Sequence, residues 1–167
     1  IGLKEASEKC KNVYPIFIFT PEQVTDKNKY KSDNAIQIMI ESLDDLQANV
    51  KEQRGNLNCY YGENDTVVKR LIKKWKIDAV FFNWDITPYA KKRDDSIKKV
   101  CSGLNIECIT KQDYYLYEPG TVFSGSDTPY TKFTPYYNKV LPINVEKPSY
   151  IRKYNFTNEQ DGDISLM

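Results

Sequence analysis

Residues 78–94 read DAVFFNWDITPYAKKRD, and this stretch decides the class of the fold. Residues 78–83 form an apolar run of the kind found in a strand that is covered on both faces. Thr87 and Pro88 follow as an N-cap and a proline at the first helical position, which predicts that a helix begins there. A buried strand that passes directly into a helix is a unit of a parallel sheet.

Working outward from this stretch, strand and helix patterns alternate along the chain. Apolar runs predict further strands at 13–20, 57–61 and 105–109. Apolar residues at helical spacing predict helices at 2–10, 34–54, 67–75 and 88–102, joined by a polar loop at 21–33. Gly55 stands where a C-terminal cap of the helix at 34–54 is expected, and Gly103 ends the helix at 88–102. This order predicts an α/β fold with a parallel sheet and helices on both faces.

The periodicity fades after residue 111, where the chain becomes rich in Tyr, Pro and Gly. We expect this segment to be an ordered loop that wraps the domain, because its aromatic side chains need burial. The last residues are polar and charged, and their composition is typical of a linker or tail.

Composition excludes several kinds of site. The chain has four cysteines, no C-x-x-C pair and no histidine, which excludes a Cys/His zinc set and any Ser–His or Cys–His nucleophile. No apolar run reaches the length of a membrane span, and IGLKEASEKC at the start lacks the apolar stretch of a signal peptide. We therefore expect a cytoplasmic or nuclear protein with buried reduced thiols, neither secreted nor bound to a membrane.

Ligands of doubly wound sheets bind beyond the carboxyl ends of the strands. The turn after residue 83 lies there, and its side chains suit a planar polar ligand. Trp84 or Tyr89 would stack on a ring, Asp85 would accept from its N–H or hydroxyl groups, and Lys92 and Arg93 would bind an acidic tail. The alternative is that Arg93 pairs with its neighbour Asp94 within the fold. No glycine-rich phosphate loop is present, which disfavours ordinary dinucleotide or NTP binding.

Motifs along most of the chain match a known family. They are YPIFIFTP at 14–21, SLDDL at 42–46, Gly55, YYGEN at 60–64, NWDITPYAKKRD at 83–94, Gly103 and SGSDTPYTKFTPYY at 124–137. Over about residues 1–142 the chain resembles the N-terminal α/β domain of the DNA photolyase and cryptochrome family. The resemblance implies a Rossmann- or flavodoxin-like, doubly wound parallel sheet.

One departure from the family concerns the sheet. The family's opening strand, which lies in the middle of the sheet, would precede Ile1 and is missing from this chain. Its absence would leave two apolar strand edges unpaired, which is an aggregation hazard. The resemblance also implies a domain boundary, with the α/β domain at 1–142 and a linker or tail at 143–167 that leads toward an absent FAD-binding helical domain.

The resemblance implies a function for this domain. Family members repair ultraviolet pyrimidine dimers with FAD in the helical domain, and the α/β domain often holds an antenna chromophore. We expect the partner of this chain to be that helical domain, in the same or a separate chain, and damaged DNA to bind only through it. Without it, this part of a deoxyribodipyrimidine photo-lyase is expected to be inactive.

The expected antenna is a deazaflavin or FMN rather than a folate. Folate-using relatives carry an Asn-Glu pair where this chain has Tyr89 and Ala90, and some relatives have no antenna. The pocket would lie between the two strand-end segments. The expected cofactor-binding residues are Phe19, Thr20, Asp33, Asn34, Trp84, Asp85, Thr87, Tyr89, Lys92 and Arg93.

Three other functions stay open at this point. The chain is also compatible with a cryptochrome light-sensor domain, with a stand-alone nucleotide- or flavin-binding module, and with a structural domain whose pocket is empty. The segment PYTKFTPYY at 129–137 resembles repair enzymes more than animal cryptochromes, which favours the photolyase.

Overall fold

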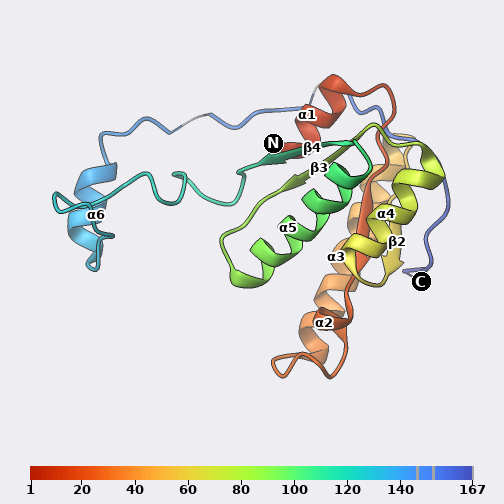
Figure 1. The fold of residues 1–167 in the computed structure, drawn as a ribbon, viewed down its shortest axis with the longest axis horizontal. Coiled ribbons are helices and arrows are strands. Elements are labelled where there is room, and N and C mark those ends of the chain that lie inside the picture. Colours follow the sequence, from red (N-terminus) through yellow and green to blue (C-terminus); the bar gives the residue numbers. More distant parts are fainter. Residues whose placement is uncertain (146, 152, 167) are drawn as a thin grey trace.

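The computed structural model of the chain describes residues 1–145, 147–151 and 153–166. Figure 1 shows the order of its elements, which is α/β as predicted. The elements are α1 (Gly2–Lys9), β1 (Ile16–Phe19), α2 (Pro21–Val24), α3 (Asp33–Glu52), β2 (Asn58–Tyr61), α4 (Asn64–Trp75), β3 (Ala79–Asn83), α5 (Pro88–Gly103), β4 (Glu107–Lys111) and α6 (Phe133–Val140). Each predicted strand and helix is present, and the short helices α2 and α6 are additions.

The strands form two parallel pairs. β1 pairs with β2 in the register Ile16 to Asn58, and β3 pairs with β4 in the register Ala79 to Glu107. Within the described residues, the two pairs are separate two-stranded sheets. A gap therefore lies between β1 and β3, in the middle of the fold, where the missing central strand was expected.

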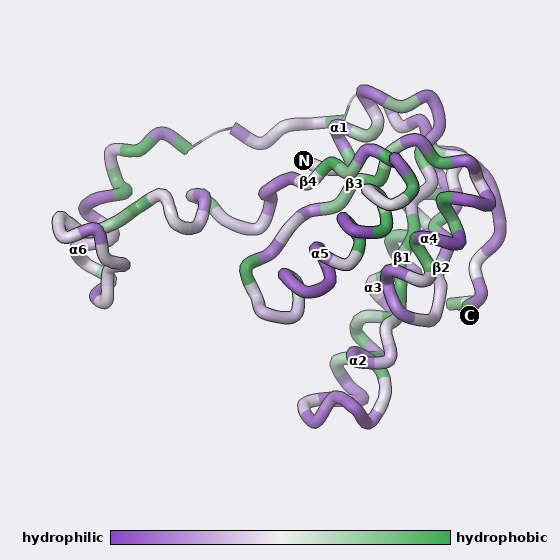
Figure 2. The backbone as a smooth tube through the Cα atoms, viewed as in Figure 1, coloured by the Kyte–Doolittle hydropathy of each residue, from purple (hydrophilic) through white to green (hydrophobic). Residues whose placement is uncertain are grey.

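Alternate side chains of each strand point to opposite faces of the sheet. Helices cover both faces and bury these side chains. On one face α3 supplies Leu43, which joins Phe19 of β1 in a hydrophobic cluster. On the other face α4 and α5 supply Val68 and Ile97, which pack with alternate residues of β1 and β3. Figure 2 shows hydrophobic residues along the strands between these layers. This is the doubly wound arrangement that the pattern predicted.

The cap predicted at Gly55 is wrong in its detail, whereas α5 ends at Gly103 as predicted. The left-handed residue after α3 is Arg54, with φ of 61°, and the one after α5 is Asn105, with φ of 55°. Gly55 matters for a different reason, since a Cβ there would lie 2.4 Å from Cβ of Phe156. Gly103 is the last residue of α5 and has open space around it.

Residues 112–145, here called the arm, do not wrap the domain as expected. Figure 1 shows that they extend away from the strands and carry α6 at their far end. The aromatic side chains pack on one another instead, as do Phe133 and Tyr137, whose stacked rings have centroids 5.8 Å apart. Phe133 remains 75% exposed, and Leu116 remains 70% exposed. The expectation is wrong because the aromatic side chains of the arm pack on one another and not against the domain. This packing buries them only in part.

Residues 153–166, here called the strap, return to the domain. Val13 donates to the carbonyl of Asn155 at 2.8 Å, and Thr157 donates to the carbonyl of Val13 at 2.9 Å. Ile164 then donates to the carbonyl of Cys59 at 3.1 Å, so the strap covers the outer edge of β2. The assignment of 143–167 as a linker toward another domain stays a prediction, and residues 146, 152 and 167 lie outside the described residues.

A buried amide fixes the strap on β2. Asn58 is 2% exposed, and its Oδ1 accepts from the backbone N–H groups of Asp161 and Gly162 at 2.7 and 3.0 Å. Its Nδ2 donates to the carbonyl of Glu159 at 2.8 Å. Every polar atom of this side chain is therefore satisfied by backbone of the strap, which makes the contact specific.

The four cysteines are free thiols, and Cys59 and Cys101 are buried. Burial raises the pKa of the Cys101 thiol to about 12, so it stays protonated at neutral pH. Among the helices that the structure describes, none combines the length and the apolar character needed to cross a membrane.

Candidate functional site

A cavity of about 300 Å³ lies at the carboxyl ends of β1 and β3, and we call it the strand-end cavity. The loops and helices that follow these strands close it, which is where this architecture places ligands. Its wall combines apolar strand residues with amide, hydroxyl and guanidinium groups. The lining residues are Ile16, Phe17, Ile18, Thr20, Gln23, Asn64, Val68, Val80, Phe81, Phe82, Asn83, Tyr89, Arg93, Ile97 and Tyr114.

Thr20 and Tyr89 connect the two sides of this cavity. Thr20 is buried at the N-cap of α2, and its Oγ1 lies 3.0 Å from Oη of Tyr89 in the first turn of α5. The same hydroxyl donates to Oε1 of Gln23 at 3.1 Å, within the capping box of α2. Two elements far apart in the sequence are thus held together by hydroxyl groups that also line the cavity.

Arg93 lines the cavity and also pairs with its neighbour. Its Nε donates to Oδ1 of Asp94 at 2.8 Å, and Asp94 is buried. The pairing with Asp94 is therefore confirmed, and it orients a guanidinium that is itself part of the cavity wall. Contact of Arg93 with a ligand stays a prediction. A guanidinium has five N–H donors, so those beyond the Asp94 pair remain for an acidic or carbonyl group.

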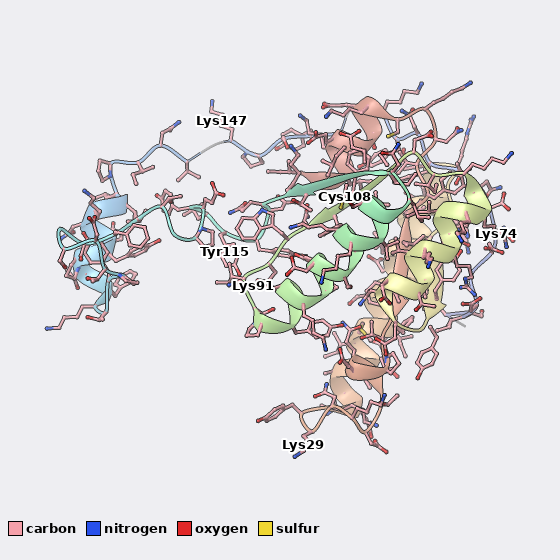
Figure 3. The ribbon with its side chains drawn as sticks, in the orientation of Figure 1. Lys29, Lys74, Lys91, Cys108, Tyr115 and Lys147 are labelled. Atoms are coloured by element: carbon pink, nitrogen blue, oxygen red, sulfur yellow. The ribbon has the colours of Figure 1, made fainter. Side chains whose placement is uncertain are left out.

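Asp85 has a different role in the structure. Its Oδ1 accepts from Oη of Tyr115 and from the backbone N–H of Ile86, both at 2.6 Å. The Tyr115 hydrogen bond holds the pKa of the Asp85 carboxyl below its usual value, and that bond raises the pKa of Tyr115. Figure 3 shows Tyr115 where the arm leaves the domain. Asp85 thus anchors the base of the arm and does not line the strand-end cavity.

The remaining predicted residues lie outside the strand-end cavity. Phe19 is buried on the α3 side, Trp84 lies beside Tyr115 with ring centroids 6.4 Å apart, and Thr87 caps α5 by accepting from the N–H of Ala90. The other three are Asp33 and Asn34, exposed in the first turn of α3, and Lys92, in a surface groove between α4 and α5. Their contact with a ligand stays a prediction.

Sequence reasoning missed several polar residues of the cavity. Gln23 was readable in principle, since Thr20 and Gln23 have the spacing of a capping box and so mark a helix start at the strand end. Asn64 and Asn83 each follow or end a strand, which is the position that the architecture favours. Tyr114 had no local signal, because it enters the cavity through the path of the arm.

The chain was compared with curated proteins of known sequence. It is 33% identical over 107 residues to a Cryptochrome-1 of Aedes aegypti, covering 64% of this chain and 19% of that protein. It is 26% identical over 128 residues to a (6-4)DNA photolyase of Arabidopsis thaliana, covering 72% of this chain and 23% of that protein. The chain therefore spans only about a fifth to a quarter of these two relatives.

The solved structures that resemble this chain also include photolyases. An archaeal photolyase from Sulfolobus tokodaii, solved with two FAD molecules and described as implying a novel light-harvesting cofactor, matches with a TM-score of 0.84 and 35% identity. The match covers 95% of this chain and 35% of that one. A class III photolyase from Agrobacterium tumefaciens shares the fold, with a TM-score of 0.80, 17% identity, and coverage of 99% of this chain and 34% of that one.

The fold and these likenesses agree with one another. The family model of DNA photolyase matches residues 1–150, which is most of the chain. The α/β architecture is that of the photolyase N-terminal domain. The chain belongs to the DNA photolyase family.

Proposed function

We propose that this chain is the antenna domain of a DNA photolyase and holds a flavin-type chromophore in the strand-end cavity. The observation that carries the proposal is the meeting of Thr20, Tyr89 and Arg93 around one cavity at the carboxyl ends of β1 and β3. The volume of about 300 Å³ lies at the small end of ligand pockets and suits a ring system better than a whole dinucleotide.

The chemistry of the wall supports a flavin or deazaflavin ring. Apolar residues of β1 and β3 face the cavity, while hydroxyl and amide groups are available for the polar edge of a ring. Arg93 would bind an acidic tail or a carbonyl oxygen. The Sulfolobus tokodaii relative, which was solved with two FAD molecules, adds support for a second flavin in this family. A folate is the less favoured pigment.

The complete activity would need a second domain. This chain spans about a third of the archaeal photolyase, and we propose that a FAD-binding helical domain, in the same or a separate chain, provides catalysis and contacts damaged DNA. The chain alone would not repair pyrimidine dimers. We place the protein in the cytoplasm or nucleus.

A titration of the purified chain tests the proposal. We expect a deazaflavin or FMN to bind saturably at one per chain, followed by its absorbance and fluorescence, and a reduced folate to bind more weakly. Saturable binding of ATP with no flavin binding would instead indicate a stand-alone nucleotide module. A folded chain that binds none of these would be a structural domain with an empty pocket.

Arg93 gives the sharpest mutational test of the cavity. Arg93→Ala is expected to weaken chromophore binding about tenfold or more, because a charge-assisted hydrogen bond is worth about 1.5–3 kcal/mol. Lys91→Ala is the matched control, since Lys91 is exposed two positions away and lines no part of the cavity. Equal affinities for the two variants would show that the ligand binds elsewhere.

The likeness to Cryptochrome-1 of Aedes aegypti favours a second candidate, a blue-light sensor with the same antenna domain. The two functions differ in what the complete protein does with light. Repair of a dimer-bearing oligonucleotide under blue light by the FAD-loaded complete protein would identify the photolyase. Light-dependent flavin reduction without repair would identify the sensor.

A further inference from the structure

The strand-end cavity has a floor and a mouth, which differ in their exposure to solvent. Val68 and Ile97 line the cavity and are each 6% exposed, so they belong to its floor. Two tyrosine side chains line the same cavity but are open to solvent, with Tyr89 at 36% and Tyr114 at 64% exposed. These two tyrosines therefore lie at the mouth, which a ligand must pass on its way in or out.

The two tyrosines at the mouth are held in different ways. The hydroxyl of Tyr89 lies 3.0 Å from Oγ1 of Thr20, which is buried in the body of the fold. Tyr114 belongs to the arm, and among the residues that the structure describes its phenol has no hydrogen-bond partner. The position of Tyr114 must therefore be fixed through the residues on either side of it.

Both neighbours of Tyr114 are hydrogen-bonded to the turn that follows β3. Asp113 accepts from Nδ2 of Asn83 at 3.2 Å, and Tyr115 donates to Oδ1 of Asp85 at 2.6 Å. We call these two contacts the pins. The partners in each pin are thirty residues apart, so the two segments run side by side in one register. The residue between the two pinned neighbours is the one that lines the cavity.

Two further contacts brace the same part of the arm. The backbone N–H of Trp84 donates to the carbonyl of Lys111 at 2.9 Å, which continues the β3–β4 ladder toward the pins. Gln112 donates through Nε2 to the carbonyl of Tyr115. This bond closes a small loop around Tyr114, and the base of the arm is thereby fixed from within as well as from the turn beside it.

The pins are the last attachment of the arm to the body before its extended part. Within the described residues, the hydrogen bonds of 116–145 join the arm only to itself. One example is the bond from Oη of Tyr117 to the carbonyl of Val140 at 3.2 Å. The extended part can therefore change its direction while the pins stay closed, whereas Tyr114 can leave the mouth only when the pins open.

We infer that the pins hold Tyr114 as a lid over the mouth of the strand-end cavity, with Asp85 as a positioning residue that acts through Tyr115. A planar ring in the cavity packs under the Tyr114 ring, and its polar edge has an unpartnered phenol within reach. Opening of the pins removes this cover, so attachment of the arm and retention of a ligand are coupled. The identity of the ligand rests on the proposed function, and the position of Tyr114 does not.

The position of Tyr114 is measured first, on the complete chain without any ligand. A fluorinated tyrosine is placed at position 114, and its fluorine NMR signal reports the surroundings of that ring. Tyr115→Phe combined with Asp113→Ala removes both pins, and we expect it to move the signal toward its position in the urea-unfolded chain. Tyr117→Phe is the matched control, because it removes the same atom from a tyrosine whose hydrogen bond lies within the arm.

FMN then tests the effect of the lid on a ligand. We expect Tyr114→Ala, and separately the removal of both pins, to weaken FMN binding about fivefold or more, chiefly through faster release. Tyr114→Phe keeps the covering ring and is expected to release FMN nearly as slowly as the unaltered chain. Tyr117→Phe should match the unaltered chain. Stopped-flow fluorescence measures the release rates, which a loss of the phenol group elsewhere in the arm would not change.

Two results would overturn the inference. The first is an unchanged fluorine signal when both pins are removed, which would show that Tyr114 keeps its place without them. The second is an FMN release rate that is the same for the unaltered chain, for Tyr114→Ala and for the chain without pins. A chain that binds no FMN would contradict the proposed chromophore instead, and the fluorine signal would still decide whether the pins position Tyr114.

Discussion

At the scale of single residues, Asp85 shows that a carboxylate at a strand end can serve the fold rather than a ligand. A carboxylate at a strand end is chemically suited to a ligand, and here it accepts from Tyr115 and from the N–H of Ile86 instead. Thr20, Tyr89 and Arg93 were among the residues expected at the strand ends, and the structure brings these three together. Sequence pattern locates the correct end of the sheet, but it does not show which side chains turn inward.

The Tyr115 contact predicts a pH effect. The folded pKa of Asp85 is lowered mainly by the Tyr115 hydrogen bond, so this contact stabilises the fold above the ordinary carboxyl pKa and is lost as pH falls through the lowered value. Tyr115→Phe is expected to raise the pKa of Asp85 toward its ordinary value near 3.8. Carboxyl-carbon NMR titration of both proteins measures the change. An unchanged Asp85 pKa in the variant would mean that backbone donors are the cause.

At the scale of elements, the long helices and the strands were predictable because burial on one or two faces sets their periodicity. The helix ends were not. Arg54 and Asn105 adopt the left-handed conformation after α3 and α5, and Gly55 is instead required by the approach of Phe156 from a segment about a hundred residues away. The strap was also invisible to pattern, because its polar residues bond to Asn58 and to backbone rather than to an apolar core.

Two glycines provide a matched test of the strap. A Cβ at Gly162 would lie 2.9 Å from the carbonyl oxygen of Cys59, whereas a Cβ at Gly103 would meet nothing within 4 Å. Gly162→Ala is expected to lower the free energy of unfolding by about 1–3 kcal/mol through overpacking. Gly103→Ala should leave it unchanged or raise it by up to about 1 kcal/mol. Urea denaturation measures the free energy of unfolding of both variants. Equal values would show that the strap moves aside for the added methyl group without loss of stability.

Ion pairs add to the attachment of the strap. Arg70 of α4 pairs with Asp163 at 2.7 Å, and Lys74, labelled in Figure 3, pairs with Asp161. These side chains are largely exposed, so each pair contributes little on its own. The main attachment is therefore the buried amide of Asn58 and the backbone bonds, and the stability difference caused by Gly162→Ala should persist at high salt.

At the scale of the whole molecule, the structure consists of a helix-covered body and the arm. The alternation of strands and helices predicts the body, because each element buries its own apolar face. The path of the arm was not predictable, since Leu116 and Phe133 gain little burial from anything in this chain. Nothing in the local sequence indicates whether an aromatic side chain packs on its own domain or lies on an exposed segment.

Limited proteolysis tests this division. Chymotrypsin is expected to cut first within the arm, at exposed sites such as Leu116 and Phe133, because little tertiary packing protects them. Tyr60 and Phe19 are buried in the body and should resist until it unfolds. Mass spectrometry of the early fragments identifies the sites. First cuts between residues 33 and 111 would show instead that the body opens more readily than the arm.

The chain contacts the same helix just before the arm and again in the strap. Lys111, just before the arm, forms an ion pair of 2.6 Å with Glu5 of α1, and Asn155, in the strap, donates to the carbonyl of Ser7 at 2.8 Å. A segment whose two flanks are both attached to one helix is more restrained than a segment attached on one side only. A force applied to the far end of the arm by a bound partner would therefore be transmitted to α1, and through α1 to β3.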